Sequence, residues 1–138
     1  MTDKHKVLEQ LFTDDKDINA NELFNLLSPF IKINKDDKNI FFLDSALNHS
    51  LKNKILLFLL GKKALFLLGE IDTDHIKPKD IIKETGIPKG SVLPTLKTLK
   101  GTKGNSFVTS SKTGYYITSY QVSKIKTQNI LNNHEKNN

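Results

Sequence analysis

The side chains of this 138-residue chain that could do chemistry are mainly lysines and hydroxyl groups. All 21 basic residues are lysine, and with 15 acidic residues the formal net charge is +6. This charge is unevenly divided, because residues 1–44 sum to −3 while residues 85–134 hold seven lysines and no acidic residue. An acid-free basic stretch attracts polyanions such as nucleic acid. Chance and a need for solubility are the alternative explanation.

Residues typical of enzymes and metal sites are sparse. The chain has no cysteine, which excludes disulfides, thiolate metal sites and cysteine nucleophiles. The histidines are scattered and have no paired ligand spacing, at His5, His49, His75 and His134. The segment 72–75 lacks the glycine and glutamate of a calcium loop, and Gly101 and Gly104 lack the context of a P-loop. We expect no enzymatic activity, no metal and no cofactor.

The sequence contains no segment that predicts a membrane protein. Residues 1–21 are polar and lack the apolar core of a signal peptide. The apolar segment 55–69 is too short to span a bilayer. Lys62 and Lys63 lie at its middle, where each would cost about 2.5–3.5 kcal/mol. We expect a cytoplasmic protein.

Two short amphipathic helices and a hairpin are predicted in the first 44 residues. Apolar residues at helical spacing are Val7, Leu8, Leu11 and Phe12 in the first helix, and Leu23, Leu26, Leu27 and Phe30 in the second. Asn19 and Glu22 form a capping pair for the second helix, and Pro29 ends it. The hairpin has strands at 30–33 and 40–44 around the polar turn NKDDKN.

The segment 51–68 is predicted to be a buried helix. Twelve of its eighteen residues are apolar, so no face of it can remain in water. The C-terminal half must cover one side, and the N-terminal elements or a second subunit must cover the other. Gly61 either kinks this helix or admits a close neighbour. Asp44 or Ser45 is the expected N-cap of a short helix before it.

The C-terminal half predicts two short helices, a hairpin and a last helix. A helix over 79–85 starts after Pro78 and ends at Gly86, which suits a left-handed stop. After the turn 87–90, a second helix runs to about Lys100 with its apolar side formed by Val92, Leu96 and Leu99. Strands at 107–109 and 115–118 enclose a polar tip at 110–114. The last helix, over 119–131, is expected to bury Tyr120, Val122, Ile125, Ile130 and Leu131.

The order helix, short turn, helix and hairpin is that of the winged helix-turn-helix fold. The segment 80–87, DIIKETGI, resembles the first helix and turn of such domains. The segment 90–100, GSVLPTLKTLK, resembles their recognition helix, and its internal proline resembles the PadR-like transcriptional regulators. The resemblance covers about 51–130 and is most specific over 77–117. The helix at 51–68 and the first fifty residues depart from the PadR-like pattern, so the resemblance is to the superfamily.

The resemblance implies an α+β, mostly α fold with one winged helix-turn-helix domain at 51–131. We expect an N-terminal helical and β-hairpin extension at 1–50 and a flexible tail at 132–138. If Gly90 or Ser91 is the N-cap, Pro94 falls in the first turn of the recognition helix, where proline is tolerated. That turn, with its free N–H groups, could then face a phosphate.

The expected DNA contacts come from the recognition helix, the wing and the start of the preceding helix. They are Lys77, Lys79, Lys89, Gly90, Ser91, Pro94, Thr95, Lys97, Thr98, Lys100, Ser111, Lys112 and Thr113. Lysine binds phosphate as a point charge, and without arginine the commonest guanine contact is missing. Serine and threonine can hydrogen-bond either partner of a base pair, and the threonine methyl and Pro94 can touch thymine methyls. We expect strong phosphate binding with modest direct base readout.

The resemblance implies a double-stranded DNA-binding transcriptional regulator, which would bind as a homodimer to two half-sites. The helix at 51–68 or the last helix could form the dimer interface. A second hypothesis is a winged-helix protein–protein interaction subunit of a replication, transcription or secretion assembly. A third, RNA binding, would use Tyr115, Tyr116 and Tyr120 as stacking platforms. The sequence identifies no small-molecule effector.

Overall fold

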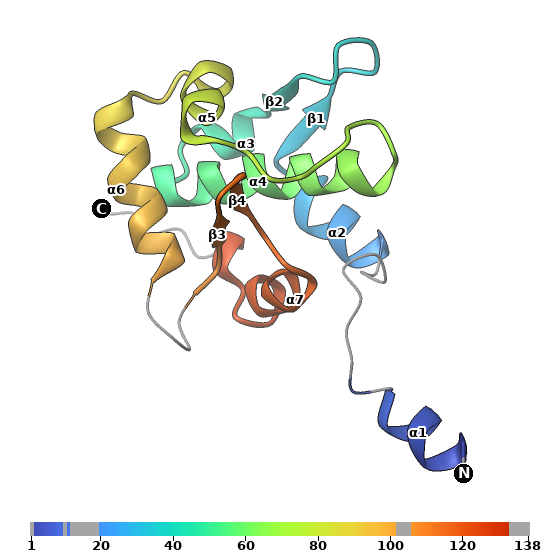
Figure 1. The fold of residues 1–138 in the computed structure, drawn as a ribbon. Coiled ribbons are helices and arrows are strands. Elements are labelled where there is room, and N and C mark those ends of the chain that lie inside the picture. Colours follow the sequence, from blue (N-terminus) through green and yellow to red (C-terminus); the bar gives the residue numbers. More distant parts are fainter. Residues whose placement is uncertain (1, 10, 12–19, 102–105, 133–138) are drawn as a thin grey trace.

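The structure of the protein is a computed structural model that describes residues 2–9, 11, 20–101 and 106–132. Helices dominate it, and the strands form two separate antiparallel hairpins (Figure 1). This agrees with the mostly helical α+β class that the sequence predicts. The elements in chain order are α1 (Thr2–Glu9), α2 (Ala20–Leu27), β1 (Ile31–Ile33), β2 (Ile40–Phe42), α3 (Asp44–Leu47), α4 (Leu51–Leu67), α5 (Pro78–Thr85), α6 (Lys89–Lys100), β3 (Thr109–Ser111), β4 (Gly114–Tyr116), α7 (Ser119–Thr127) and the 3₁₀ helix η2 (Ile130–Asn132).

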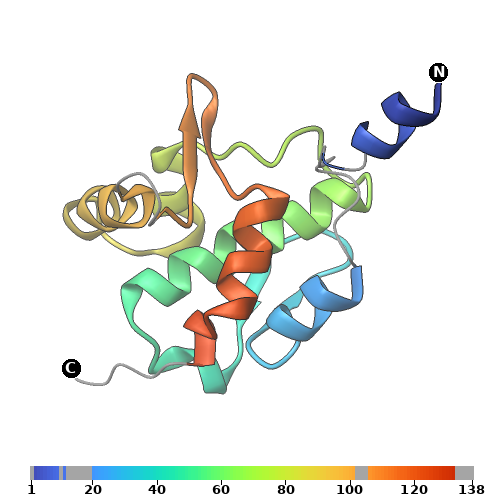
Figure 2. The ribbon, with the colours of Figure 1, turned by 90° about the horizontal axis from the view of Figure 1, so that it is seen from below.

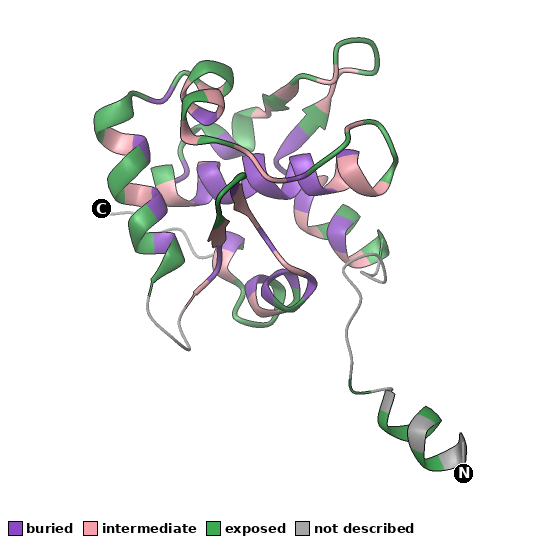
Figure 3. Ribbon diagram, in the orientation of Figure 1, coloured by how far each residue is buried: buried purple, intermediate pink, exposed green. Residues whose placement is uncertain are grey.

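Helix α4 is the centre of the molecule, as its composition requires. Eleven of its seventeen residues are buried, and Figure 3 shows it as an almost continuous buried rod. Helix α2 and strand β1 cover one side, and α5, α6 and β4 cover the rest. The same chain therefore supplies the elements that pack on both sides of α4. No second subunit is needed to shield α4.

Helix α2 and the β1–β2 hairpin pack on α4, whereas the predicted apolar face of the first helix, at Val7, Leu8 and Leu11, is exposed. Leu23, Leu27 and Phe30 are buried, and β1 pairs with β2 in the predicted hairpin. Gly61 of α4 admits this hairpin, since a Cβ there would lie 2.8 Å from Ile40 Cδ1. The close-neighbour role expected of Gly61 is confirmed. One core cluster joins residues on both sides of residue 50.

The helix caps differ in part from the prediction. The N-cap of α3 is Leu43, without a side-chain cap, so the expectation of Asp44 or Ser45 is wrong. The Ser45 hydroxyl, after the β1–β2 hairpin, instead donates to the carbonyl of Pro29, which precedes this hairpin. Helix α4 is capped by Ser50, whose hydroxyl accepts from the Asn53 N–H. The predicted cap Asn19, the apolar residue Phe12 and the tail after residue 132 lie outside the described residues.

Helices α5 and α6 form at the predicted places with a shorter connection. Pro78 is the first residue of α5, and Gly86 ends it at φ 77°, in the left-handed region that glycine tolerates best. Helix α6 begins at Lys89 with Pro88 as N-cap, so the predicted turn 87–90 is too long. Its predicted apolar side, Val92, Leu96 and Leu99, is fully buried.

The second hairpin has shorter strands than predicted and a tighter tip. Ser111 pairs with Gly114, so only Lys112 and Thr113 form the turn. Phe107 and Val108 are buried ahead of β3 instead of lying in it. A third segment joins this hairpin, because Ile76 and Tyr115 exchange backbone hydrogen bonds of 2.9 and 2.8 Å. No pattern in the sequence indicates this bridge.

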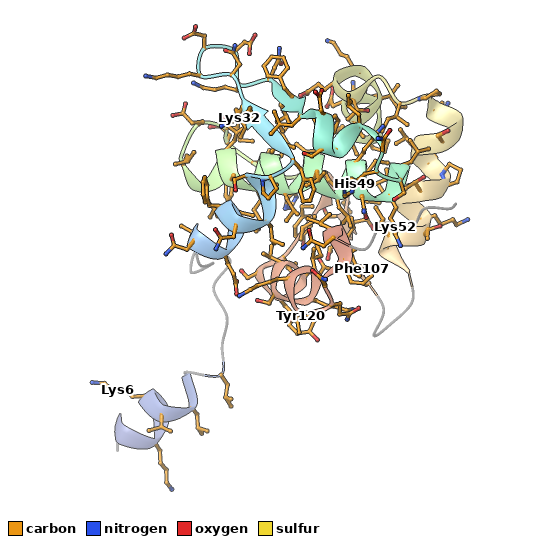
Figure 4. All side chains as sticks on the ribbon, turned by 180° about the vertical axis from the view of Figure 1, so that it is seen from behind. Lys6, Lys32, His49, Lys52, Phe107 and Tyr120 are labelled. Carbon is orange, nitrogen blue, oxygen red and sulfur yellow. The ribbon has the colours of Figure 1, made fainter. Side chains whose placement is uncertain are left out.

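The last helix is interrupted, and one of its predicted core residues points outward. Helix α7 ends at Thr127, and the separate helix η2 buries Leu131. Tyr120 is 71% exposed, so its predicted burial is wrong (Figure 4). The reason is helical phase, since the position lies about 200° around the helix from the buried Val122.

Candidate nucleic-acid interface

Helix α6 presents a polar face opposite its buried one. Pro94, Lys97 and Thr98 are exposed, and Ser91 and Thr95 are half-buried at the edge of this face. The helix packs on α4 and α5 through the buried side. The face that the sequence analysis proposed for DNA is therefore free of packing against these helices.

Hydrogen bonds restrict what the two threonines of α6 can do. The Thr95 hydroxyl donates to the Ser91 carbonyl at 2.7 Å, and the Thr98 hydroxyl donates to the Pro94 carbonyl at 3.1 Å. A hydroxyl has one proton, so each oxygen keeps only acceptor capacity for a ligand. In this arrangement the two threonines can accept from an amino group and can offer a methyl group.

Pro94 does not lie in the first turn of α6. With Pro88 as N-cap, it is the sixth residue of the helix, so the expectation based on a cap at Gly90 or Ser91 is wrong. Proline has no N–H, and the Gly90 carbonyl therefore receives no helical hydrogen bond from position 94. Gly90 is exposed, so water can bind that carbonyl.

The tip of the second hairpin is held by a histidine that the sequence analysis did not use. His75 Nδ1 lies 2.6 Å from Thr113 Oγ1 and 3.3 Å from Ser111 Oγ. The His75 ring stacks on Tyr116, with centroids 3.9 Å apart and planes at 11°. The hydroxyls of Ser111 and Thr113 therefore brace the turn. Lys112, at its apex, is exposed.

Lys77 and Lys79 lie beside the same hairpin because of the strand bridge. Lys77 is the N-cap of α5 and directly follows Ile76, which pairs with Tyr115 of β4. Both lysines are exposed. Figures 1 and 2 show the hairpin standing beside α6. The bridge thus brings the start of α5 close to the hairpin, which the sequence order alone did not indicate.

The exposed lysines of this region have no acidic partner among the described residues. In the described part of the chain, no ion pair involves Lys77, Lys79, Lys89, Lys97, Lys100 or Lys112. Lys126 instead pairs with Glu22 at 3.0 Å. Lys124 lies over the Phe107 ring at 5.0 Å and donates to the Ser106 carbonyl. Lys103 lies outside the described residues.

One buried and one partly exposed ion pair fix the elements that carry this surface. Lys63 is fully buried in α4, and its Nζ lies 3.1 Å from Asp74 Oδ2 in the segment that leads to Ile76. Lys62 Nζ lies 2.8 Å from Glu84 Oε1 in the last turn of α5. The signal for both pairs was present in the sequence, since lysines within a buried apolar helix need partners.

The arrangement offers lysine charges, threonine acceptors and methyl groups. Among the described residues, no group of three or more histidine, cysteine, aspartate or glutamate residues is placed to hold a metal ion. Over the same residues, no helix combines the length and apolar character needed to cross a membrane.

Comparisons with family models, curated proteins and solved structures find no match for this chain.

Proposed function

We propose that this protein is a DNA-binding transcriptional regulator of the winged helix-turn-helix type. Helix α6 would enter the major groove as the recognition helix, and the β3–β4 hairpin would lie as a wing on the backbone or minor groove. The bridge between Ile76 and Tyr115 supports this proposal, because a third strand segment ties the hairpin to the helices.

The observation that carries the proposal is a surface on which exposed lysines from α5, α6 and the β3–β4 turn come together without carboxylate partners in the described structure. In the described part of the chain, Lys62, Lys63 and Lys126 pair with carboxylates, whereas the six lysines of the α5, α6 and hairpin surface do not. Other exposed lysines of that part, such as Lys32 and Lys35, are also unpaired, but they lie in the acidic first third of the chain. An unmatched cationic surface gains free energy from binding phosphates through counterion release. Six such contacts would make the affinity fall steeply with salt.

The proposed readout is weak in hydrogen-bond donors and rich in acceptors and methyl groups. Thr98 and Thr95 can accept from the amino groups of adenine or cytosine, and methyl groups suit thymine. The chain has no arginine for bidentate guanine contacts. We therefore propose a preference for A·T pairs under the centre of α6.

A homodimer on two half-sites remains part of the proposal. Helix α4 is enclosed within one chain and is unsuitable as the interface. Tyr120 of α7, exposed at the surface, is the better candidate, because aromatic residues are enriched at protein interfaces.

A second function, binding of a protein partner, is favoured by Leu93 of α6, which is partly exposed on the helix that carries the proposed DNA-binding face.

Fluorescence anisotropy with a random duplex at about 50 mM salt tests the proposal. We expect binding that disappears as the salt concentration rises, and a selected sequence from a random pool that is palindromic if the protein is a dimer. Absence of binding at the lowest salt would reject DNA binding and leave the protein-interaction function.

A further inference from the structure

An open apolar groove of about 990 Å³ lies between α2, β1 and the end of α4. Leu27 and Ile31 contribute buried side chains to it. Phe24 and Leu68 also line the groove, yet they are 65% and 71% exposed. Two large apolar side chains exposed beside one groove form a patch of the kind that marks an interaction site.

Helix α1 carries a second apolar face that packs on nothing in the described structure. Its apolar side chains Val7 and Leu8, and Leu11 just beyond its end, are all at least 60% exposed. Figure 4 shows α1 and its labelled Lys6 standing clear of the rest of the molecule. A helix of eight residues is marginal in water unless a tertiary surface supports it. Helix α1 therefore needs a surface to pack against.

The chain connects these two apolar surfaces. Ala20, the first residue of α2, itself lines the groove. Eight residues of sequence, 12–19, separate it from Leu11, and even fully extended they span at most about 30 Å. A tether of this length gives α1 an effective concentration on the order of millimolar at the groove of its own chain. A second copy or a separate peptide reaches that concentration only in very concentrated solution.

We propose that α1 folds back onto its own chain and docks Val7, Leu8 and Leu11 in the groove between α2, β1 and the end of α4. This is the amphipathic helix-in-groove mode of recognition, with both partners on one chain. Figures 1 and 2 show α6 and the groove-forming α2 at opposite sides of the molecule. The docked α1 therefore leaves the proposed DNA surface open, and this inference does not depend on the proposed function.

Spin-label distance measurements test the docking, because the chain has no cysteine and two introduced ones are its only thiols. Labels at Thr2→Cys, at the start of α1, and Lys35→Cys, in the β1–β2 turn, report whether α1 lies at the groove. We expect one narrow distance distribution that a tenfold excess of unlabelled protein leaves unchanged. Leu8→Gln on α1 and Phe24→Gln in the groove should each broaden it.

Matched controls use the same substitution on the other faces of the same helices. Lys6→Gln on α1 and Asn25→Gln on α2 should leave the distribution narrow. All four side chains are exposed, so the variants should fold, which far-UV circular dichroism verifies. A broad distribution in the parent protein, or equal broadening in variants and controls, would overturn the proposal. Loss of the short distance on dilution with unlabelled protein would assign the groove to α1 of a second copy and overturn docking within one chain.

Discussion

At the scale of single residues, lysine and threonine define the proposed interface. The exposed lysines of α5, α6 and the β3–β4 turn can each neutralise a phosphate without recognising a base. The threonines of α6 have their protons engaged with backbone carbonyls, so they contribute acceptors and methyl groups. In the proposed interface, affinity and base preference therefore depend on different side chains, and substitution can separate them.

The first prediction concerns affinity. The triple variant Lys89→Ala, Lys97→Ala and Lys112→Ala should bind every duplex more weakly, by at least about tenfold at low salt, because three phosphate contacts are lost. The slope of log affinity against log salt should fall by about 3. Anisotropy titrations over a range of salt measure both quantities.

The control for this triple variant removes the same charge elsewhere. Lys6→Ala, Lys32→Ala and Lys35→Ala, all exposed in the N-terminal part, lower the net charge by the same amount. This control should change the slope by less than 1. An equal slope change in both triple variants would mean that net charge alone governs binding, which contradicts the proposed docking.

The second prediction concerns base preference. Thr98→Val keeps the shape of the side chain and removes the acceptor oxygen. We expect the affinity for a selected site to fall about fivefold, close to the 1 kcal/mol of one hydrogen bond, with the salt slope unchanged. Thr127→Val is the control, since the Thr127 hydroxyl makes the same kind of bond, to the Ser123 carbonyl, on α7. If both variants bind the selected site as the parent does, Thr98 does not read a base.

At the scale of elements, ion pairs and a glycine position the hairpin relative to the helices. Lys63 and Asp74 attach the segment after α4 to the core, and this segment supplies Ile76 to the β4 edge. Gly114 permits that contact, because a Cβ there would lie 2.6–2.7 Å from the Ile76 backbone. The hairpin therefore depends on contacts far from its own turn.

The third prediction is that Lys63→Met strongly destabilises the fold. It leaves the carboxylate of Asp74, itself only 5% exposed, without its lysine partner. Breaking a buried pair in this way costs about 3–5 kcal/mol of unfolding free energy. Lys126→Met, which breaks the exposed pair with Glu22, should cost less than about 1 kcal/mol. Urea unfolding of the two variants measures the difference, and equal losses would contradict the role given to the buried pair.

The fourth prediction is that Gly114→Ala separates the hairpin from the segment at Ile76. The new Cβ meets backbone, and φ at this position is +138°, a conformation that alanine rarely adopts. We expect loss of slow hydrogen exchange at the Ile76 and Tyr115 amides and a lower unfolding free energy. Gly90→Ala, in open space on α6, should instead be neutral or stabilise by about 0.5–1 kcal/mol. Retained protection at Ile76 in Gly114→Ala would contradict the prediction.

At the scale of the whole molecule, one core holds the N-terminal elements and the C-terminal half together. Leu23 and Phe30 belong to the same buried cluster as Leu96 and Val122. The acidic first third of the chain therefore has a structural role, because it covers one side of α4. The lysine surface lies on the other elements, which leaves it separate from this acidic part.

The fifth prediction concerns truncation. Removal of residues 1–19 deletes α1 and leaves the core cluster intact, so cooperative thermal unfolding should be retained. Removal of residues 1–50 exposes the side of α4 that packs on α2 and β1, and we expect no cooperative transition. Thermal unfolding of the two fragments, followed by circular dichroism, shows whether each unfolds cooperatively. A cooperative melt of the shorter fragment would show that residues 51–138 fold alone.

The sequence by itself determined the local elements of this protein and the uneven distribution of its charge. Helical spacing at Leu23 and Leu27, and the left-handed stop at Gly86, act over a few residues and are visible in the chain. The rotational orientation of the last helix and the register of the strands were harder to predict. Tyr120 pointed outward and β3 started two residues late, because helix phase and strand register depend on neighbours that the pattern does not contain.

Only the tertiary structure decided which lysines are matched and what covers the central helix. The sequence indicates that Lys63 needs a partner, but only the structure identifies this partner as Asp74. Ile76 with Tyr115 joins residues far apart in the chain, and His75 braces a turn 38 residues away. Such contacts leave no short-range signal, because each depends on how α4 orients the segments around it. The sequence therefore supplied the charge, and the packing around α4 decided which part of that charge remains available to a partner.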